Sequence, residues 1–376
     1  TKTLEFRYRQ AFVNGKIEFD TAISRDDERP GETRGYLFGD GSFNLRNDFK
    51  LRFDVEMTSD DAYLQDYGYS TKDRLDSQVL LSRAKREEYT AGSLIYYQSL
   101  RDSEQSSTIP SIIGDLFYQR RFSPEDIPGE LRLTANLHNH IRDSDRDIVG
   151  RDVQRLNTEV NWLNAFGLPG GVRAETQVGL AGDIFNITQD STTQQNQTQF
   201  TPFTTLALRY PMSRTDQSGA TQFIEPIGQV AWTGSSQLDI PNEESTLVDF
   251  DGGNLLALSR FPAPDRRERG AVGAFGINWS RFALGGSEHA LTLGQVVRKN
   301  ADESFTQSSG LAGTESDYLV AGQIKTQNGF AITARTLFDQ SFDFTKAEVL
   351  GGYRHPRGTL TGSYLWLIKD PAESRF

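Results

Sequence analysis

FKLRFDVEM, residues 49–57, alternates apolar and charged side chains without a break. Because successive side chains of a β-strand point to opposite faces of a sheet, this period of two predicts a strand with one apolar face and one charged face. The same period recurs elsewhere, for example in residues 4–9, 131–137 and 156–162. No segment of about twelve residues or more shows a convincing helical period. The sequence therefore predicts an all-β protein.

The composition fits a sheet protein with one polar face. Aromatic residues make up 11% of the 376 residues while hydrophobic residues reach only 36%, and a disordered chain would be poor in aromatics. The net charge of −11 argues against a nucleic-acid partner, which normally needs a basic surface. Short basic clusters at 83–86, 120–121 and 266–269 are expected to be solvated loop ends, and the alternative is contact with an anionic lipid headgroup or a sugar phosphate.

Connections between the predicted strands alternate in length. Asn14-Gly15 is a tight hairpin turn of the favoured type. The connections at 25–33 and 59–74 are long, whereas the one at 46–48 is short. Further long connections are expected at 99–112, 139–153, 180–199, 234–270 and 299–315. In an antiparallel sheet, successive connections lie at opposite ends, so the long loops gather at one end.

This asymmetry is typical of outer-membrane barrels, which have short periplasmic turns and longer extracellular loops. The segments also have the roughly 10 residues that a strand needs to cross a bilayer. The sequence therefore predicts an antiparallel transmembrane β-barrel with about 18 strands, as one domain over residues 1–376 with a long loop at 234–270. A β-propeller would need an internal repeat, and none is found. A β-sandwich would not sort its loops by length.

No catalytic, cofactor or metal site is predicted. His138 and His140 would face the same way on a strand, but two imidazoles without a third ligand make an incomplete metal site. The acidic run 143–147 begins like a calcium loop, but Ile148 occupies the place of the turn glycine. The chain lacks cysteine, a nucleophile elbow and a phosphate loop. An outer-membrane hydrolase would need a catalytic set on its loops, and no residues point to one.

The longest interruption is NEESTLVDFDGGNLLALSRFPAPDRRERG, residues 242–270. It separates the predicted strands at 223–232 and 270–282 and has an apolar centre at 255–258. A solvated loop would not need that centre. The sequence therefore predicts an excursion that folds against the barrel or caps its lumen.

This part of the chain resembles the LptD (OstA) family of lipopolysaccharide-assembly outer-membrane proteins. The resemblance rests on EPIGQVAW (225–232), IPNEEST (240–246) and DFDGGNLLALSRFPAPDRRERGAVGAFGINW (249–279), and more weakly on residues 47–83. It implies a barrel of 26 strands, plugged by the lipoprotein LptE. Lipopolysaccharide arrives from a periplasmic bridge through an N-terminal jellyroll domain and leaves through the lumen and a lateral gate. It thus implies a translocon in the outer membrane, without cofactors, and not an enzyme.

The strand count and the missing jellyroll depart from the family pattern, so we expect a barrel segment cut at both ends that lacks the last strands. The loop is expected to seat the plug or to line the sugar's path, although its motif could also be only a loop-folding signature. The candidate residues are Asp249, Phe250, Asp251, Asn254, Arg260, Phe261, Asp265 and Arg266. Phe250 and Phe261 would anchor the loop by burial, and Asp265 and Arg266 by charged hydrogen bonds. The alternative function is a general outer-membrane channel or receptor for small solutes.

Overall fold

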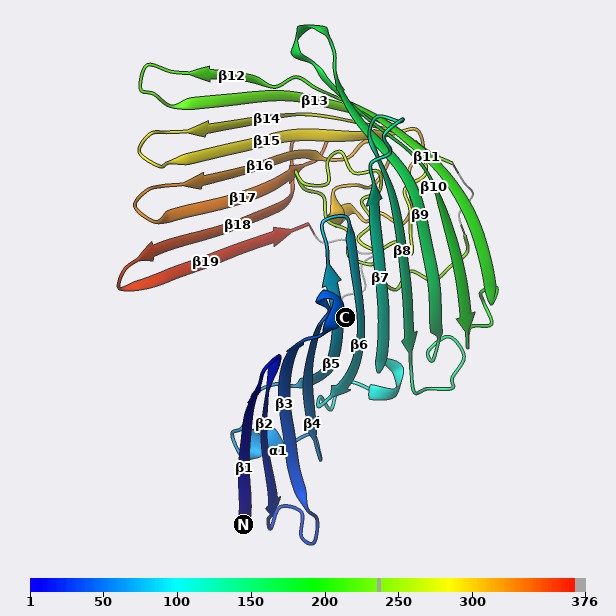
Figure 1. The fold of residues 1–376 in the computed structure, drawn as a ribbon, viewed down its shortest axis with the longest axis vertical. Helices are drawn as coiled ribbons and strands as arrows, with labels where there is room; N and C mark the ends of the chain where they lie inside the picture. Colours follow the sequence, from blue (N-terminus) through cyan, green and yellow to red (C-terminus); the bar gives the residue numbers. More distant parts are fainter. Residues whose placement is uncertain (235–237, 369–376) are drawn as a thin grey trace.

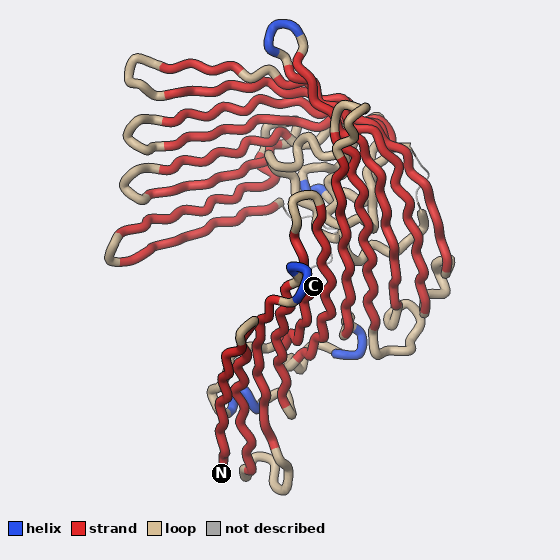
Figure 2. The backbone as a smooth tube through the Cα atoms, in the orientation of Figure 1, coloured by secondary structure: helices blue, strands red, loops and turns tan. Residues whose placement is uncertain are grey.

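The computed structural model describes residues 1–234 and 238–368. Within these residues the chain forms one antiparallel sheet of 19 strands, which confirms the all-β prediction (Figures 1 and 2). The first strands are β1 (Lys2–Phe12), β2 (Gly15–Arg25), β3 (Arg34–Asn44), β4 (Lys50–Thr58), β5 (Arg74–Ala84), β6 (Glu88–Ser99), β7 (Ile112–Phe122), β8 (Glu130–Ile141), β9 (Asp152–Gly167) and β10 (Arg173–Thr188).

The remaining strands are β11 (Asn196–Arg209), β12 (Met212–Thr215), β13 (Thr221–Thr233), β14 (Gly270–Phe282), β15 (Glu288–Arg298), β16 (Tyr318–Lys325), β17 (Phe330–Phe338), β18 (Phe344–His355) and β19 (Gly358–Leu367). The short helices are η1 (Arg46–Asp48), α1 (Tyr63–Asp66), η2 (Ser106–Thr108), η3 (Pro169–Gly171) and η4 (Gln307–Ser309). No helix in the described ranges is long and apolar enough to cross a membrane.

Strands pair with their neighbours in sequence, with one interruption. β11 and β12 both pair with β13, on either side of Pro211, so they form one broken crossing of the sheet. Pro211 has no N–H to donate, which explains the break. With β11 and β12 counted together, the number of crossings agrees with the prediction of about 18. Pro226, whose carbonyl accepts from the backbone N–H of Tyr210, lies within β13.

Long and short connections alternate as the sequence predicted. The connections at 26–33, 59–73, 100–111, 142–151, 234–269 and 299–317 are long, whereas those at 13–14, 85–87, 326–329 and 356–357 are short. The connection predicted at 180–199 is shorter, because β10 and β11 extend to Thr188 and from Asn196 and pair up to Asn186↔Asn196. The sheet curves strongly, and the longest loops lie on its concave side (Figure 1). Among the described residues no pairing joins β1 to β19, so the curved wall is open.

The two faces of the wall differ in chemistry. Leu116, Leu137, Val160 and Leu180 project from the outer face of β7 to β10 and remain between 43% and 49% exposed. They follow one another across the sheet through the pairs Leu116↔Leu137 and Val160↔Leu180. The neighbouring positions on the inner face of β8 and β9 carry polar and charged residues instead. An apolar outer band with a polar inner face is the pattern of an outer-membrane barrel.

The buried apolar residues lie between the concave face and the long loops. The largest group joins residues of loops 234–269 and 299–317 to strands β13 to β17. A second, smaller group joins Ile240 to Val153, Phe185 and Ile187. The wall thus has no second sheet to pack against, and its loops take that role.

Candidate functional site

The loop between β13 and β14, residues 234–269, crosses the concave side of the wall and contacts strands on both sides of it. Its first anchor is Glu243. One carboxylate oxygen lies 2.7 Å from Arg142 Nη2 and 2.9 Å from His140 Nε2, and the other lies 2.9 Å from Arg151 Nη1. The loop's start is therefore bound to the ends of β8 and β9.

Glu244 anchors the loop beside Glu243. Arg155 of β9 donates to its carboxylate from Nε at 2.9 Å and from Nη2 at 2.8 Å, and His138 Nε2 lies 3.0 Å away. Such two-pronged arginine–carboxylate contacts fix orientation as well as distance. The cross-strand pair His138↔Arg155 presents both partners from one place on the inner face.

Burial opposes ionisation of the Glu243 carboxyl group, but the contacts with His140 and Arg142 outweigh this effect. They lower its pKa from 4.5 to about 2. The carboxyl group is therefore charged over the whole physiological range, and the anchor holds there.

The Glu243 anchor is expected to weaken at acidic pH. Because the pKa is depressed in the folded protein, its stabilisation is fully present above the unfolded value of 4.5 and is lost as the pH falls toward about 2. A shift of this size corresponds to about 3 kcal/mol. Hydrogen exchange of the loop amides, corrected for the intrinsic pH dependence, should therefore accelerate across this window. Glu243→Gln should remove most of that dependence, and an unchanged dependence would assign it to another carboxyl group.

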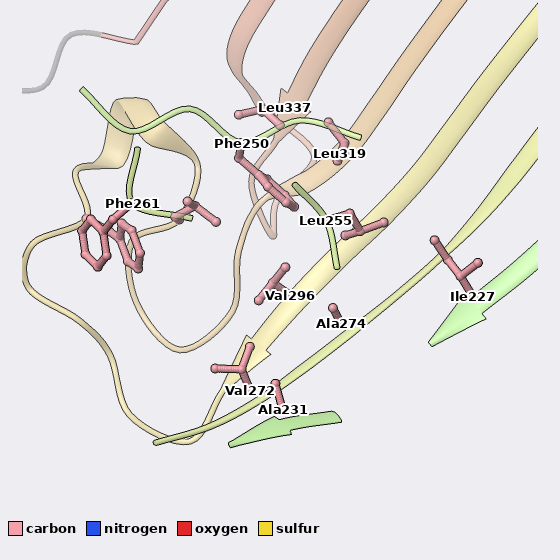
Figure 3. Packing of buried hydrophobic residues seen from close by; sticks show 12 residues of the cluster. Ile227, Ala231, Phe250, Leu255, Phe261, Val272, Ala274, Val296, Leu319 and Leu337 are labelled. Atoms are coloured by element: carbon pink, nitrogen blue, oxygen red, sulfur yellow. The ribbon is translucent and has the colours of Figure 1, made fainter. Parts of the chain in front are cut away.

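The loop's centre is held by apolar packing. Phe250 and Leu255 are completely buried, and Phe261 nearly so, against Val272, Val296 and Leu319 of the wall (Figure 3). Phe261 also stacks on Phe305 of the next long loop, with ring centroids 4.5 Å apart. Burying each large side chain contributes about 1.5–3 kcal/mol. The apolar run that the sequence shows at 255–258 thus lies against the inner face of β13 to β17.

Two glycines make room for Leu255. Gly276 of β14 pairs with Gly294 of β15 on the inner face. A Cβ atom added to Gly294 would lie 2.4 Å from Leu255 Cδ2, and one added to Gly276 would lie 2.8 Å from the same atom. Carbon atoms do not approach so closely, so the seat of Leu255 exists only because both positions lack a side chain.

Gly294→Val is expected to displace Leu255 and loosen the loop while leaving the wall intact. The three atoms nearest to an added Cβ all belong to Leu255, and valine itself suits a strand. The loss should approach that of a buried leucine truncation, about 2–5 kcal/mol for loop opening. Protease sensitivity of residues 248–260 would measure it. The control is Gly273→Val on the other face of β14, where an added Cβ has its nearest neighbour at 3.9 Å. If both variants loosened the loop equally, the space at Gly294 would not be what holds Leu255.

A buried ionic group closes the loop's end. Arg260 Nη1 lies 3.0 Å from both carboxylate oxygens of Glu268, and Arg298 Nε of β15 donates to Glu268 Oε2 at 3.2 Å. The backbone N–H of Arg260 donates to Glu268 Oε1 at 2.9 Å. All three side chains are almost fully buried. One carboxylate therefore ties two positions of the loop to each other and to the wall.

The other residues predicted from the sequence fall in two places. Asp249 contacts Lys346 and, at 3.1 Å, Arg335. Asp251 accepts from the backbone N–H of Asn254 at 3.0 Å, and Asn254 Nδ2 donates to the Asp249 carbonyl at 2.7 Å. These three residues build the turn that meets β17 and β18.

Asp265 and Arg266 each bind a different partner. Ser245 Oγ donates to Asp265 Oδ1 within the loop. Arg266 donates from Nη1 to Ser304 Oγ at 2.9 Å and from Nη2 to the Ile240 carbonyl at 3.2 Å. Burial raises the pKa of the Asp265 carboxyl group and lowers that of the Arg266 guanidinium. Asp265 therefore links two parts of the loop, whereas Arg266 links the loop to itself and to the next long loop, 299–317.

Several loop contacts come from residues that the sequence analysis did not select. Besides Glu243, Glu244 and Glu268, they include Arg267, which donates to both carboxylate oxygens of Asp183 at 3.1 Å. In the sequence these contacts are marked by the adjacent acidic residues Glu243 and Glu244 in IPNEEST, whose basic partners lie on β8 and β9 and in the connection between them. His138 and His140 face this pair, and no group of three or more His, Cys, Asp or Glu in the described part of the chain is arranged to hold a metal.

Two cavities flank the loop on the concave side. One, of about 690 Å³, lies between Asp249 and Asp251 of the loop and the inner faces of β15 to β19. The other, of about 580 Å³, reaches from Leu256 of the loop to Arg132, Arg173 and Arg209 on β8 to β11. The loop thus stands between two open spaces of different chemistry.

A second long loop, 59–73, is also ordered by a buried arginine. Arg34 donates to Asp60 Oδ1 at 2.8 Å, to Asp66 Oδ2 at 2.7 Å and to Asp26 Oδ2 at 3.1 Å. The same loop buries Tyr63, whose hydroxyl lies 2.8 Å from Ser24 Oγ. This ionic cluster closes the long-loop end above β2 to β5.

A family model described as LptD, LPS transport system D, matches residues 32–375. No curated protein matches the chain. Among solved structures, the chain is similar to the alcaligin outer-membrane receptor FauA from Bordetella pertussis, with 9% sequence identity and a TM-score of 0.32. The match covers 96% of this chain and 65% of that one, so the chain spans about two thirds of the receptor's length.

Proposed function

This chain belongs to the LptD family and lies in the outer membrane, and we propose that it forms part of a translocon that inserts lipopolysaccharide into the outer leaflet. The observation that carries the proposal is the family match, which extends over nearly the whole chain. In this proposal the lipopolysaccharide passes through the lumen and a lateral gate. The chain acts as a conduit and catalyses no reaction.

The chemistry of the wall supports a path for a sugar-rich molecule. The inner face is polar and charged, and its open cavities are lined by residues such as Arg132, Arg209 and Arg335. Lipopolysaccharide carries phosphate and sugar groups, which such side chains bind by charged hydrogen bonds. The apolar outer face meets the membrane lipid.

We infer that loop 234–269 seats a plug protein, of the kind that LptE provides in this family, or lines the sugar's path. Its turn at Asp249, Asp251 and Asn254 borders the cavity toward β19, and Leu256 borders the cavity toward β8. A loop fixed on both sides by ion pairs and apolar packing offers a firm surface for such a partner. In this role Phe250, Arg260, Phe261, Asp265 and Arg266 hold the surface in place.

Depletion of the full-length protein tests the function. Newly made lipopolysaccharide should disappear from the cell surface and accumulate inside, while other outer-membrane barrels still assemble. Normal delivery during depletion would reject the translocon. The protein would then be a channel or receptor, which solute uptake and conductance in planar bilayers would reveal.

A further inference from the structure

Two basic clusters of the sequence, residues 83–86 and 120–121, meet on the folded wall. Arg121 Nη2 donates to the carbonyl of Arg86, 35 positions earlier in the chain, at 2.6 Å. The backbone N–H of Arg121 donates to the Glu87 carbonyl at 2.8 Å. The two clusters thus form one basic patch at the short-turn end of β5, β6 and β7, and this proximity depends on strand pairing.

The basic patch borders the apolar band of the outer face. Leu116 of that band pairs with Gly92 of β6, and Gly92 pairs with Leu81 of β5. Because side chains alternate between the two faces of a sheet, Arg83, two residues beyond Leu81, projects from the same outer face. Arg120, four residues beyond Leu116, does so as well. Long basic side chains at the edge of an apolar band reach the level of the lipid headgroups.

Three cations of the basic patch have no carboxylate partner. Lys85, Arg86 and Arg120 are exposed, and within residues 1–234 and 238–368 no ion pair joins their side chains to an acidic residue. The guanidinium carbon of Arg120 instead lies 4.9 Å from the ring centre of Phe122. These three side chains are therefore accessible donors that can bind an anion from solvent or from a membrane surface.

The acidic residues nearby do not neutralise the basic patch, which contains five basic residues. Glu88, the second acid after the first cluster, is paired with Arg83. Neither acidic residue of the turn 123–129 forms an ion pair with the patch in the part of the chain that the structure describes. With Glu87 as the remaining acid of the turn at 85–87, the patch keeps an excess of positive charge.

We propose that the basic patch binds the phosphate of an anionic lipid headgroup in the membrane leaflet at the short-turn end. Lys85, Arg86 and Arg120 supply charged donors, which phosphate oxygens accept, and basic residues near a membrane surface attract anionic lipid. Phe122, which is 37% exposed beside Arg120, and the apolar band supply the adjacent surface for the acyl chains. The site does not depend on the proposed transport of lipopolysaccharide.

The test is a triple variant of the full-length protein, Lys85→Gln, Arg86→Gln and Arg120→Gln, which leaves the pair of Arg83 with Glu88 in place. Titration with spin-labelled phosphatidylglycerol in a neutral detergent would give the affinity, and a phosphate-free galactolipid is the neutral comparison. In a second arm, ³¹P NMR would follow binding of inorganic phosphate alone. Each basic residue near an anionic lipid surface contributes about fivefold to binding, so the variant should lower the affinity for phosphatidylglycerol by about a hundredfold.

The matched control is a second triple variant, Lys50→Gln, Arg52→Gln and Arg354→Gln, which also removes one lysine and two arginines from the short-turn end. These side chains are exposed, but by the alternation along β4 and β18 they lie on the inner face. Weaker binding of phosphatidylglycerol by the first variant and not by the control would support the headgroup site. Equal weakening by both variants, or no saturable binding of phosphatidylglycerol, would overturn it. An effect on inorganic phosphate without one on phosphatidylglycerol would also overturn it, in favour of a site for free phosphate.

Discussion

Glu268→Ala is expected to open loop 234–269 and to cost about 3–5 kcal/mol of its local stability. The substitution leaves Arg260 and Arg298 buried side by side without their shared carboxylate. Two like charges that lack an acceptor can regain solvation only if the loop leaves the wall. Hydrogen exchange of the loop amides in the full-length protein would measure the free energy of opening.

The control is Glu288→Ala on the same strand as Arg298. Glu288 pairs with Lys325 at 3.7 Å, and both side chains are 50% exposed. Exposed pairs of this kind contribute about 0–1 kcal/mol. If the two alanine variants opened the loop equally, the buried ionic group would not be its main lock.

Deletion of residues 249–266, bridged by a short glycine–serine linker, is expected to leave the protein in the outer membrane and to reduce surface lipopolysaccharide toward the level seen on depletion. The deletion removes the turn at Asp249 and the buried Phe250 and Phe261, but it leaves the strand pairing of β13 with β14 untouched. A plug or a sugar chain would lose the surface that the loop offers. Pulse-labelled surface lipopolysaccharide and co-purification of the plug protein are the measurements.

A matched replacement of residues 123–129 controls for a general effect of shortening a connection. These residues are exposed at the short-turn end between β7 and β8. The control should leave surface lipopolysaccharide unchanged. Unimpaired surface lipopolysaccharide in the 249–266 deletion would reject the functional role of the loop and leave it a purely structural element.

Much of the fold follows from local sequence signals. The two-residue period in 49–57 is visible because each strand has one face toward lipid and one toward a polar interior. The alternation of short and long connections could also be predicted from the sequence, because Asn14-Gly15 is a residue pair that strongly favours a tight hairpin turn. The break between β11 and β12 was not predicted, because a proline shows where a ladder bond is missing but not which strand lies opposite.

The loop's partners could not be predicted from the sequence. Glu243 and Glu244 are bound by residues of β8 and β9, and their acidic charge alone does not identify which basic residues lie within reach. That choice depends on register and on the curvature of the wall. The position of Leu255 could not be predicted for the same reason, since Gly276 and Gly294 become neighbours only through strand pairing. The roles proposed for Asp249, Asn254 and Asp265 in partner binding remain predictions.

The placement of loop 234–269 also sets an order of events during assembly. Glu243 binds Arg142, 101 positions earlier in the chain, and Asp249 binds Lys346, 97 positions later. Contacts between such distant positions form late, because the intervening chain must first be organised. A nascent wall that has not yet added β17 and β18 lacks the partners of Asp249, although β8, β9 and β13 to β16 can already contact the loop. The complete set of loop contacts can therefore form only after β17 and β18 have joined the wall.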